Sequence, residues 1–316
     1  MSTEILSRHP AGAGTGPEIM RFLGVTTAQS SIHGLFPRWA RALGLPAARL
    51  IGQDLPLGSP PEVYRAAVAG LAADPRTRGA LITSHKTGVH AAAADLFDEL
   101  DDHATLCGEI SLITKHDGRL RGAARDVVTA GRALRELLAP DHFARTGGHA
   151  LCLGAGGAGL AIAVMLLHRH TDRPGRLLVS DVLPERLRKV HELAQTLGTP
   201  VDVRCDPSGD GLLAGLPAGS LVINATGMGK DRPGSPLGDT APFPREAVVW
   251  ELNYRGPLTF LRQAGRQAAE RGLRVADGWR YFLHGWADHI GGVYGTSIGE
   301  ETFARLDTIA HISGES

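Results

Sequence analysis

The sequence has little of several features that define special classes of protein. Only 3 of its 316 residues are cysteine, without Cys-x-x-Cys spacing, so no disulfide framework or cysteine-based zinc site is expected. The 33 basic side chains balance 33 acidic ones, which leaves no excess positive charge for nucleic acid or anionic lipid. The first 20 residues lack the apolar stretch of a secretory signal peptide, and no membrane-spanning segment is predicted. We therefore expect a cytoplasmic protein with a small-molecule partner.

What the sequence does contain is typical of a globular protein. Hydrophobic residues make up 43% and charged residues 21%, close to the average for domains with a packed core. The chain of 316 residues is longer than most single domains, which favours two domains, each with its own core. We expect residues 1–20 to form a flexible tail before the first domain.

Strand-like apolar runs alternate with helical patterns through the first part of the chain. Two short runs flank His116-Asp117-Gly118, a turn signal that predicts a hairpin. The alternation predicts an α/β domain over residues 21–132. Its other predicted elements are strands at 21–27, 49–55 and 79–84 and helices at 32–45, 60–75 and 89–100.

The second part of the chain repeats the alternation and predicts a doubly wound parallel sheet. We assign residues 133–286 to this second domain. The helical pattern at 279–312 is too long and amphipathic to be a tail, so residues 287–312 are expected to pack back on the first domain. The predicted strands lie just before Gly154 and at 176–182, 201–205, 221–226, 247–253 and 274–278.

Glycines in the spacing Gly-x-Gly-x-x-Gly stand between an apolar run and a helical pattern. In a Rossmann domain the first glycine permits a sharp turn, the second admits a pyrophosphate and the third lets the helix pack closely. The free N–H groups of the helix N-terminus then bind the phosphates. Tight packing without a ligand is the alternative. The motif predicts a dinucleotide site formed by Gly154, Gly156, Gly157, Ala158 and Gly159.

Asp181 ends the next predicted strand and bears on which dinucleotide binds. A carboxylate there accepts hydrogen bonds from the adenosine ribose and repels a 2′-phosphate, so NAD is the expected cofactor. Arg186 and Arg188 follow in the predicted helix. They either form a solvated helix face or soften that preference, so NADP stays open.

Four further segments carry a resemblance that covers residues 22–290. They read ALITSHK (80–86), GAARD (122–126), VINATGMG (222–229) and WELNYRGPLTFLRQA (250–264). With the glycine motif they resemble the shikimate/quinate dehydrogenase family, whose members oxidise a hydroxyl group with NAD or NADP. The resemblance implies that Lys86 and Asp126 are catalytic and that the first domain binds the substrate. It also implies that the turn beside the nicotinamide consists of Asn224, Ala225, Thr226, Gly227 and Met228.

The chemistry of hydride transfer explains why a lysine and an aspartate would act together. Oxidising an alcohol requires a group that removes the hydroxyl proton, and reducing a ketone requires the same group to return it. A half-buried Lys86 near a positive nicotinamide would have a lowered pKa, whereas a carboxylate from Asp126 would orient the ammonium and oppose that shift. From spacing alone, a structural ion pair is the alternative.

The expected substrate contacts depart from the family pattern. Ala80, Ile82 and Ser84 replace an asparagine, a threonine and a proline of the family, and Ser111 replaces a second asparagine. An unpaired buried ligand hydroxyl costs about 1–3 kcal/mol, which argues against shikimate itself. Ser30 and Ser31 would bind a carboxylate unless they only cap the following helix. The substrate-binding candidates are Gln29, Ser30, Ser31, Ser111, Tyr254 and His284.

These features predict an enzyme of one kind, with two alternatives. The leading hypothesis is an NAD(P)-dependent oxidoreductase that interconverts a hydroxyl and a ketone on a hydroxylated cyclic acid or polyol, such as shikimate, quinate, aminoshikimate or a cyclitol. A ligand-sensing protein that kept the fold and a folate-type one-carbon dehydrogenase are the alternatives. His85 and His90 share no helical face and have no third ligand, so no metal site is predicted. A homodimer is expected.

Overall fold

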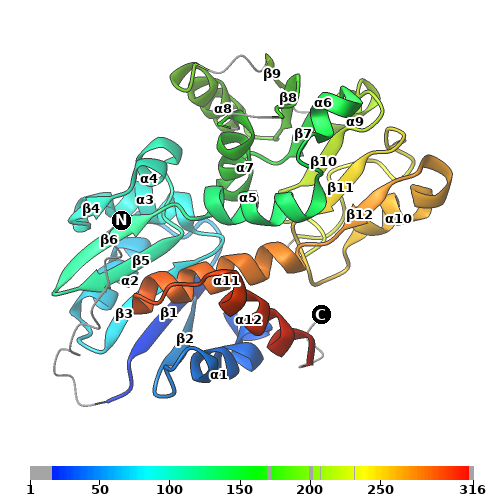
Figure 1. The fold of residues 1–316 in the computed structure, drawn as a ribbon. Helices are drawn as coiled ribbons and strands as arrows, with labels where there is room; N and C mark the ends of the chain where they lie inside the picture. Colours follow the sequence, from blue (N-terminus) through cyan, green and yellow to red (C-terminus); the bar gives the residue numbers. More distant parts are fainter. Residues whose placement is uncertain (1–15, 169–171, 199–201, 207, 231, 313–316) are drawn as a thin grey trace, which may run out of the picture.

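The computed structural model describes residues 16–168, 172–198, 202–206, 208–230 and 232–312. These residues form two six-stranded sheets flanked by helices, which confirms the predicted α/β class. Figure 1 shows the two sheets as separate parts of the molecule, with α5 (Asp126–Leu137) and α11 (Trp279–Tyr294) running between them.

The first sheet has the strand order β2-β1-β3-β5-β6-β4. β1 pairs in parallel with β2 and β3, whereas β5 runs antiparallel to β3 and to β6. β5 and β6 form the predicted hairpin, and both of its turn residues, Asp117 and Gly118, have positive φ angles of 50° and 77°. The strands are β1 (Ile19–Gly24), β2 (Arg49–Asp54), β3 (Thr77–Ile82), β4 (Glu99–Leu100), β5 (Leu112–His116) and β6 (Arg119–Ala123).

The start of the first strand differs from the predicted one. Ile19 and Met20 belong to β1 and are buried, so the predicted tail of residues 1–20 is too long at its end. Residues 1–15 of that predicted tail lie outside the described residues.

The helices of the first part are α1 (Ile32–Ala42), α2 (Pro61–Ala73), α3 (Lys86–Ala93) and α4 (Asp102–Cys107). The predicted helix at 89–100 is wrong in its second half, because α3 ends at Ala93 and the chain turns at 94–96 into β4. The backbone there bonds to the sheet: the N–H of Asp98 donates to the carbonyl oxygen of Leu120 at 2.9 Å. Sheet pairing has overridden the local helical pattern.

The second sheet is entirely parallel, with the order β12-β11-β10-β7-β8-β9, which confirms the doubly wound prediction. The strand order reverses between β7 and β10, the crevice at which such sheets bind ligands. The strands are β7 (Ala150–Leu153), β8 (Arg176–Ser180), β9 (Asp202–Cys205), β10 (Leu221–Asn224), β11 (Val248–Glu251) and β12 (Arg274–Ala276). The helices are α6 (His142–Thr146), α7 (Gly157–Leu167), α8 (Pro184–Thr196), α9 (Gly209–Ala214) and α10 (Thr259–Arg271).

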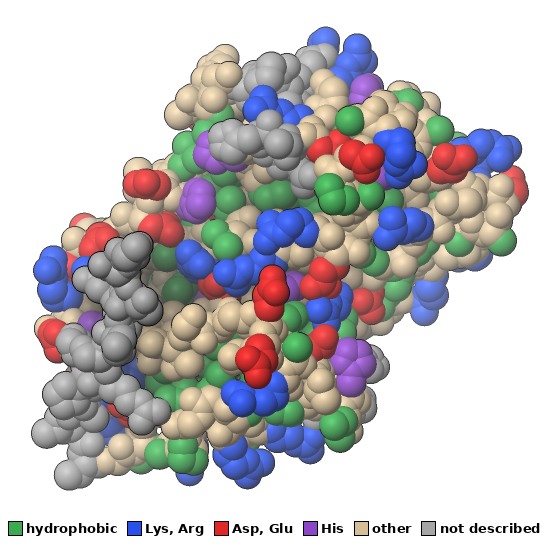
Figure 2. All heavy atoms as spheres, viewed as in Figure 1, with side chains coloured by type: hydrophobic (Ala, Val, Ile, Leu, Met, Phe, Trp, Pro, Cys, Tyr) green, Lys and Arg blue, Asp and Glu red, His purple; other side chains and the backbone are tan. Residues whose placement is uncertain are grey.

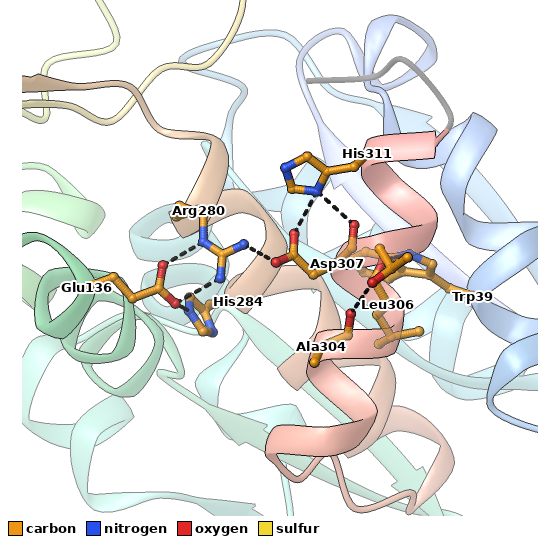
Figure 3. A network of polar contacts seen from close by, with 9 residues as sticks. Trp39, Glu136, Arg280, His284, Ala304, Leu306, Asp307 and His311 are labelled. Atoms are coloured by element: carbon orange, nitrogen blue, oxygen red, sulfur yellow. Dashed lines mark hydrogen bonds and ion pairs between the residues drawn. The ribbon is translucent and has the colours of Figure 1, made fainter.

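The C-terminal pattern at 279–312 forms two helices rather than one. α11 ends at Gly295, whose φ of 63° stops the helix, and α12 covers Glu300–Ile312. Trp286 and Ile290 of α11 and Leu306 of α12 are buried in one core with the first sheet. The indole N–H of Trp39 on α1 donates to the carbonyl oxygen of Leu306 at 2.9 Å, which ties α12 to α1 (Figure 3).

The surface in Figure 2 carries charges of both signs. Basic and acidic side chains are interspersed on this face, and both gather across the middle of the molecule, over α5, α11 and α12. Among the described residues, no helix is long and apolar enough to span a membrane.

Candidate active site

Lys86 and Asp126 stand in the first turns of two helices, α3 and α5, that follow β3 and β6. Lys86 Nζ donates a hydrogen bond to Asp126 Oδ2, and the two side chains are only 12% and 7% exposed. The two residues are 40 positions apart in the sequence, yet the sheet brings the helix starts together. The predicted catalytic residues therefore form a buried ion pair.

The surroundings keep this pair ionised in the protein alone. Burial lowers the pKa of Lys86, but the charges of Asp126 and Glu109 raise it, and the resulting pKa lies above its usual value. Burial raises the pKa of Asp126, but Lys86 and a hydrogen bond from the Tyr281 hydroxyl lower it further than burial raises it. In the protein alone, the opposing shift expected from a carboxylate therefore outweighs burial, because two carboxylates face the ammonium.

Two buried residues beside the pair were missed from the sequence. Glu109 is fully buried, and neither of its carboxylate oxygens has a hydrogen-bond partner within the described residues. His289 on α11 lies near Asp126 and Lys86, and burial lowers its pKa, so the ring is neutral. In the sequence, Glu109 is a charged residue just before the apolar run of β5. This was the one signal that could have marked it as a candidate site residue.

The glycine-rich segment joins β7 to α7 and has the geometry of a phosphate-binding turn. Gly154 has a φ of 98°, and a Cβ atom there would lie 2.8 Å from the carbonyl carbon of Ala225. A Cβ atom on Gly159 would lie 2.0 Å from the carbonyl oxygen of Gly154. At Gly156 the nearest neighbour is the Arg186 guanidinium at 3.8 Å, and Gly156, Gly157 and Ala158 are partly exposed. This cradle fits a dinucleotide pyrophosphate.

Asp181, the predicted ribose contact, holds this turn through hydrogen bonds to its backbone. Its carboxylate accepts hydrogen bonds from the N–H groups of Ala155 at 2.8 Å and Leu183 at 3.0 Å. Arg186 Nη1 lies 3.4 Å from Asp181 Oδ2. Of the two interpretations of Arg186, the structure favours a place beside the dinucleotide turn over a purely solvated helix face.

The turn after β10 is held in shape by its own side chains. Asn224 Oδ1 accepts hydrogen bonds from the Thr226 N–H at 3.1 Å and the Thr226 hydroxyl at 2.6 Å. Asn224 Nδ2 donates to Glu251 Oε2 at 2.7 Å, and burial raises the pKa of Glu251 to about 7. Gly227 has a φ of 74°, and no atom lies within 4 Å of its Cβ position. The predicted cofactor residues 224–228 thus form a rigid turn at the crevice beside Gly154.

The dinucleotide turn meets the ion pair at Gly157. A Cβ atom there would lie 2.5 Å from Glu109 Oε2 and 3.4 Å from Lys86 Cδ. The first turn of α7 is therefore packed directly against Lys86 at the start of α3 and Glu109 between α4 and β5. Within the described residues, no group of three or more histidine, cysteine, aspartate or glutamate side chains is arranged to hold a metal ion.

A hollow lies at the end of β1 and is lined by polar and aromatic side chains. Ser30 Oγ and the Tyr254 hydroxyl are 3.3 Å apart, so two predicted substrate-binding residues are brought together there. Gln29 accepts a hydrogen bond from Arg255 at 3.2 Å at the same place. Ser31 precedes α1 without capping it and is not among the lining residues. The lining includes Phe22, Thr26, Thr83, Ser84, Lys230, Arg255, Phe282 and Trp286.

Two predicted substrate contacts are corrected by the structure. Ser111 is fully buried, and its hydroxyl accepts a hydrogen bond from the Arg125 N–H at 2.8 Å, so it holds the backbone before Asp126. His284 Nε2 lies 2.7 Å from Glu136 Oε1 (Figure 3). The His284 ring stacks on Phe303. Phe282 and Trp286 line the hollow instead of His284. They are one helical turn apart and therefore share a side of α11 that differs from the side of His284.

Comparison with solved structures supports the fold. Shikimate 5-dehydrogenase from Listeria monocytogenes, solved with shikimate and NAD, matches with a TM-score of 0.70 and 21% identity over 94% of this chain and 96% of that one. Quinate dehydrogenase from Corynebacterium glutamicum, solved with NAD, matches with a TM-score of 0.69 and 21% identity over 94% of this chain and 100% of that one. No protein-family model matches the chain. These likenesses show a two-domain α/β fold.

The family follows from sequence similarity. Shikimate dehydrogenase (NADP+) from Methylobacterium radiotolerans is 34% identical over 257 residues, which cover 80% of this chain and 82% of that protein. The chain belongs to the shikimate dehydrogenase family, as its motifs predicted. This membership supports the oxidoreductase hypothesis over the sensor and one-carbon alternatives.

Proposed function

We propose that the protein interconverts a hydroxyl and a ketone on a hydroxylated cyclic acid or polyol by hydride transfer, with Lys86 and Asp126 as the catalytic residues. The observation that carries this proposal is the buried Lys86–Asp126 pair packed against the first turn of α7. Bound NAD(H) or NADP(H) supplies the hydride acceptor or donor. The acid–base pair and the dinucleotide turn would then face the same reacting carbon.

The protein residues supply the proton. Lys86 is an ammonium in the protein alone, so it is ready to protonate the oxygen of a ketone during reduction. In the opposite direction it takes the hydroxyl proton, once it has lost its own. Asp126 aligns the ammonium, and Tyr281 and the helix N-terminus of α5 stabilise the aspartate.

The two domains would bind different ligands. We propose that residues 21–132 bind the substrate and residues 133–286 the dinucleotide, with 287–312 packed back on the first domain. The sheet order, the glycine turn and the burial of α11 and α12 residues beside the first sheet support this division. The proposed boundary between 132 and 133 falls inside α5, which runs from one part to the other.

The hollow at the end of β1 suits an anionic substrate. Ser30, Tyr254 and Arg255 combine hydroxyl donors with a guanidinium, which binds a carboxylate through charge-assisted hydrogen bonds. Arg255 Nε is buried and has no hydrogen-bond partner within the described residues, so it has capacity for an acceptor. We propose that Ser30, Tyr254 and Arg255 bind the acid group, with Gln29 orienting Arg255.

Shikimate itself is not the proposed substrate. Ala80 and Ile82 are fully buried in β3, and the Ser111 hydroxyl is bonded to the backbone, so the polar contacts of the family pattern are missing. Quinate, aminoshikimate and cyclitols remain in the proposed class. NAD is the proposed cofactor, because the buried Asp181 carboxylate would repel a 2′-phosphate.

The function is tested by following the reduced-nicotinamide absorbance band with each cofactor against shikimate, quinate, aminoshikimate and cyclitols. We expect turnover on one of the last three compounds and a preference for NAD. Lys86→Ala should lower turnover by about 10²–10⁴-fold with little change in dinucleotide affinity. Binding of these compounds without any redox change would contradict the proposal and favour a sensor.

Assembly and location are proposed on separate grounds. Cys107, Cys152 and Cys205 are all unpaired, which suits the reducing cytoplasm. β12 is an edge strand of the second sheet, and we propose that this part of the protein forms a homodimer. Sedimentation at micromolar concentration tests the dimer, and a single monomeric species would remove it.

A further inference from the structure

Glu109 is the buried charge that the proposed mechanism does not use. It lies between α4 and β5, its exposure is 0%, and neither carboxylate oxygen has a hydrogen-bond partner within the described residues. Buried carboxylates in native proteins are nearly always hydrogen-bonded, because an unpaired one costs several kilocalories per mole. An unsatisfied group of this kind therefore calls for a functional explanation.

Glu109 lies beside the proposed dinucleotide turn. Glu109 Oε2 lies so close to Gly157 that a Cβ atom on that glycine would be 2.5 Å away. Gly157 is the first residue of α7, where unpaired N–H groups and the helix dipole would bind a pyrophosphate. The glutamate thus points at the proposed phosphate site from the segment between α4 and β5.

Charged groups from several elements face Glu109. Lys86 of α3 and Lys189 of α8 favour its ionised form, whereas Asp126 of α5 and Asp101, which precedes α4, disfavour it. Tyr281 of α11 and Cys107 of α4 also interact with its charge. Burial is the largest effect, and it raises the pKa of Glu109 to about 8. At neutral pH this carboxyl therefore carries a proton.

We propose that Glu109 links dinucleotide binding to proton uptake, so that the phosphates bind tightly only when this carboxyl is neutral. The inference rests on the proposed function only in requiring that NAD(H) or NADP(H) binds at the glycine turn. An ionised Glu109 would repel the phosphates and compete for the N–H groups of α7, at a short distance and in a dry environment. Glu109 acts as a positioning residue, since it does not touch the reacting atoms.

The proton balance follows directly. When Glu109 is ionised before binding, one proton moves from solvent to its carboxylate as the dinucleotide binds. When Glu109 is already protonated, no proton moves. By linkage, the affinity is constant well below pH 8 and falls towards tenfold per pH unit above it.

The test measures NADH binding to the intact protein by nucleotide fluorescence from pH 6 to 9.5. NADH is the probe because it has no 2′-phosphate that titrates in this range. We expect the dissociation constant to be about tenfold larger at pH 9 than at pH 7. Calorimetry at pH 9 in two buffers of different ionisation heat should show uptake of nearly one proton per bound NADH.

Two variants separate Glu109 from other titrating groups. Glu109→Gln should bind NADH with nearly the same affinity at pH 7 and pH 9 and without proton uptake. Glu62→Gln, a matched change on the exposed face of α2, should keep the wild-type pH dependence. If Glu109→Gln folds poorly, the wild-type protein still tests the inference, because the absence of proton uptake at pH 9 would overturn it.

The outcomes distinguish this inference from the proposed function. A pH-independent NADH affinity in the wild type, or an unchanged pH dependence in Glu109→Gln, would overturn the role of Glu109 and leave the enzyme proposal intact. Failure of NADH and NADPH to bind the folded wild-type protein at any pH would overturn both.

Discussion

Two clusters of charged side chains connect α5 to α11, and they differ in burial and in how fully they are paired. The inner cluster consists of Lys86, Asp126, Glu109, Tyr281 and His289. The outer cluster consists of Glu136, Arg280, His284 and Asp307 (Figure 3). α5 contributes Asp126 at its start and Glu136 near its end, so the same pair of helices carries both clusters.

The outer cluster is a structural brace that holds α5, α11 and α12 together. Arg280 bonds Glu136 through Nε at 2.5 Å and Nη2 at 2.9 Å, and it bonds Asp307 of α12 through Nη1 at 2.5 Å. The Arg280 and Glu136 side chains are 31% and 36% exposed, so water still solvates their charges. The inner cluster is buried and leaves Glu109 and His289 Nε2 without partners. Asp307 Oδ1 of the outer cluster also has no hydrogen bond within the described residues, but it lies 3.2 Å from His311 Nδ1, so each charged side chain there has a partner. An unpaired carboxyl group in a dry site is typical of function, whereas paired charges near the surface are typical of stability.

The largest effect is expected at Asp126. Asp126→Asn removes the charge that orients Lys86 and raises its pKa, so turnover should fall by about 10²-fold or more. The limb of the pH–rate profile that reports Lys86 should move to lower pH. Asp307→Asn is the matched change in the outer cluster and should leave both turnover and profile unaltered. Equal losses in the two variants would remove the distinction between the clusters.

A steric change at Gly157 should come next. Gly157→Ala places a methyl group against Glu109 and Lys86, which we expect to destabilise the protein by about 1–3 kcal/mol and to weaken NADH binding. Gly265→Ala in α10 has no atom within 4 Å of its new methyl group and should stabilise the protein by about 0.5–1 kcal/mol. Denaturant unfolding measures both. Similar stabilities of the two variants would show that α7 does not pack tightly on the inner cluster.

Breaking the outer cluster should affect stability alone. Arg280→Gln removes the contacts to Glu136 and Asp307, and we expect a loss of about 1–2 kcal/mol with turnover unchanged. Arg65→Gln removes an exposed pair with Asp95 and should leave the free energy of unfolding nearly unchanged. A large fall in the turnover of Arg280→Gln at a temperature where the variant is folded would contradict a purely structural role for the outer cluster.

The two clusters should also respond oppositely to pH. The pKa of Glu109 is raised to about 8, so the folded protein binds an extra proton above the usual glutamate pKa, and stability falls as pH rises from about 4.5 towards 8. The slope from one group is at most about 1.4 kcal/mol per pH unit. Burial raises the pKa of Glu136 but Arg280 and His284 lower it further, so its contribution is lost only as pH falls below about 4.5. Unfolding of Glu109→Gln and wild type across pH 5 to 8 checks the first slope, because the stability of the variant should fall less steeply than that of the wild type. Glu251, whose pKa is raised to about 7, and His289, whose pKa burial lowers, contribute slopes of opposite sign in both proteins.

Local patterns were enough to predict most of the fold. The parallel second sheet and the glycine turn follow from apolar runs, turn residues and the special backbone of Gly154, all of which act over a few residues. The hairpin at Asp117-Gly118 was predicted for the same reason. The helix at 89–100 was not, because β4 exists only through its pairing with β6 from a later part of the chain.

The candidate site was predicted in part. Lys86 and Asp126 were recognised by motif, and Ser30 and Tyr254 were correctly grouped, since their hydroxyls meet in one hollow. Ser111 and His284 were assigned to the substrate because residue type suggested it, whereas their hydrogen bonds commit them to the backbone before Asp126 and to Glu136. Nothing in the sequence indicates which side of α11 faces the hollow.

The sequence by itself determined the strand and helix alternation, the dinucleotide turn and the pairing of a lysine with an aspartate, because each is written in neighbouring residues or in a motif. Only the tertiary structure decided the electrostatics of the site. Burial and the Asp126 carboxylate raise the pKa of Glu109 against the opposing charges of Lys86 and Lys189. The carboxylates of Asp126 and Glu109 raise the pKa of Lys86 against the opposing effect of burial. Those contacts depend on how distant segments pack, and the pKa of a buried group is set by that packing rather than by its place in the chain.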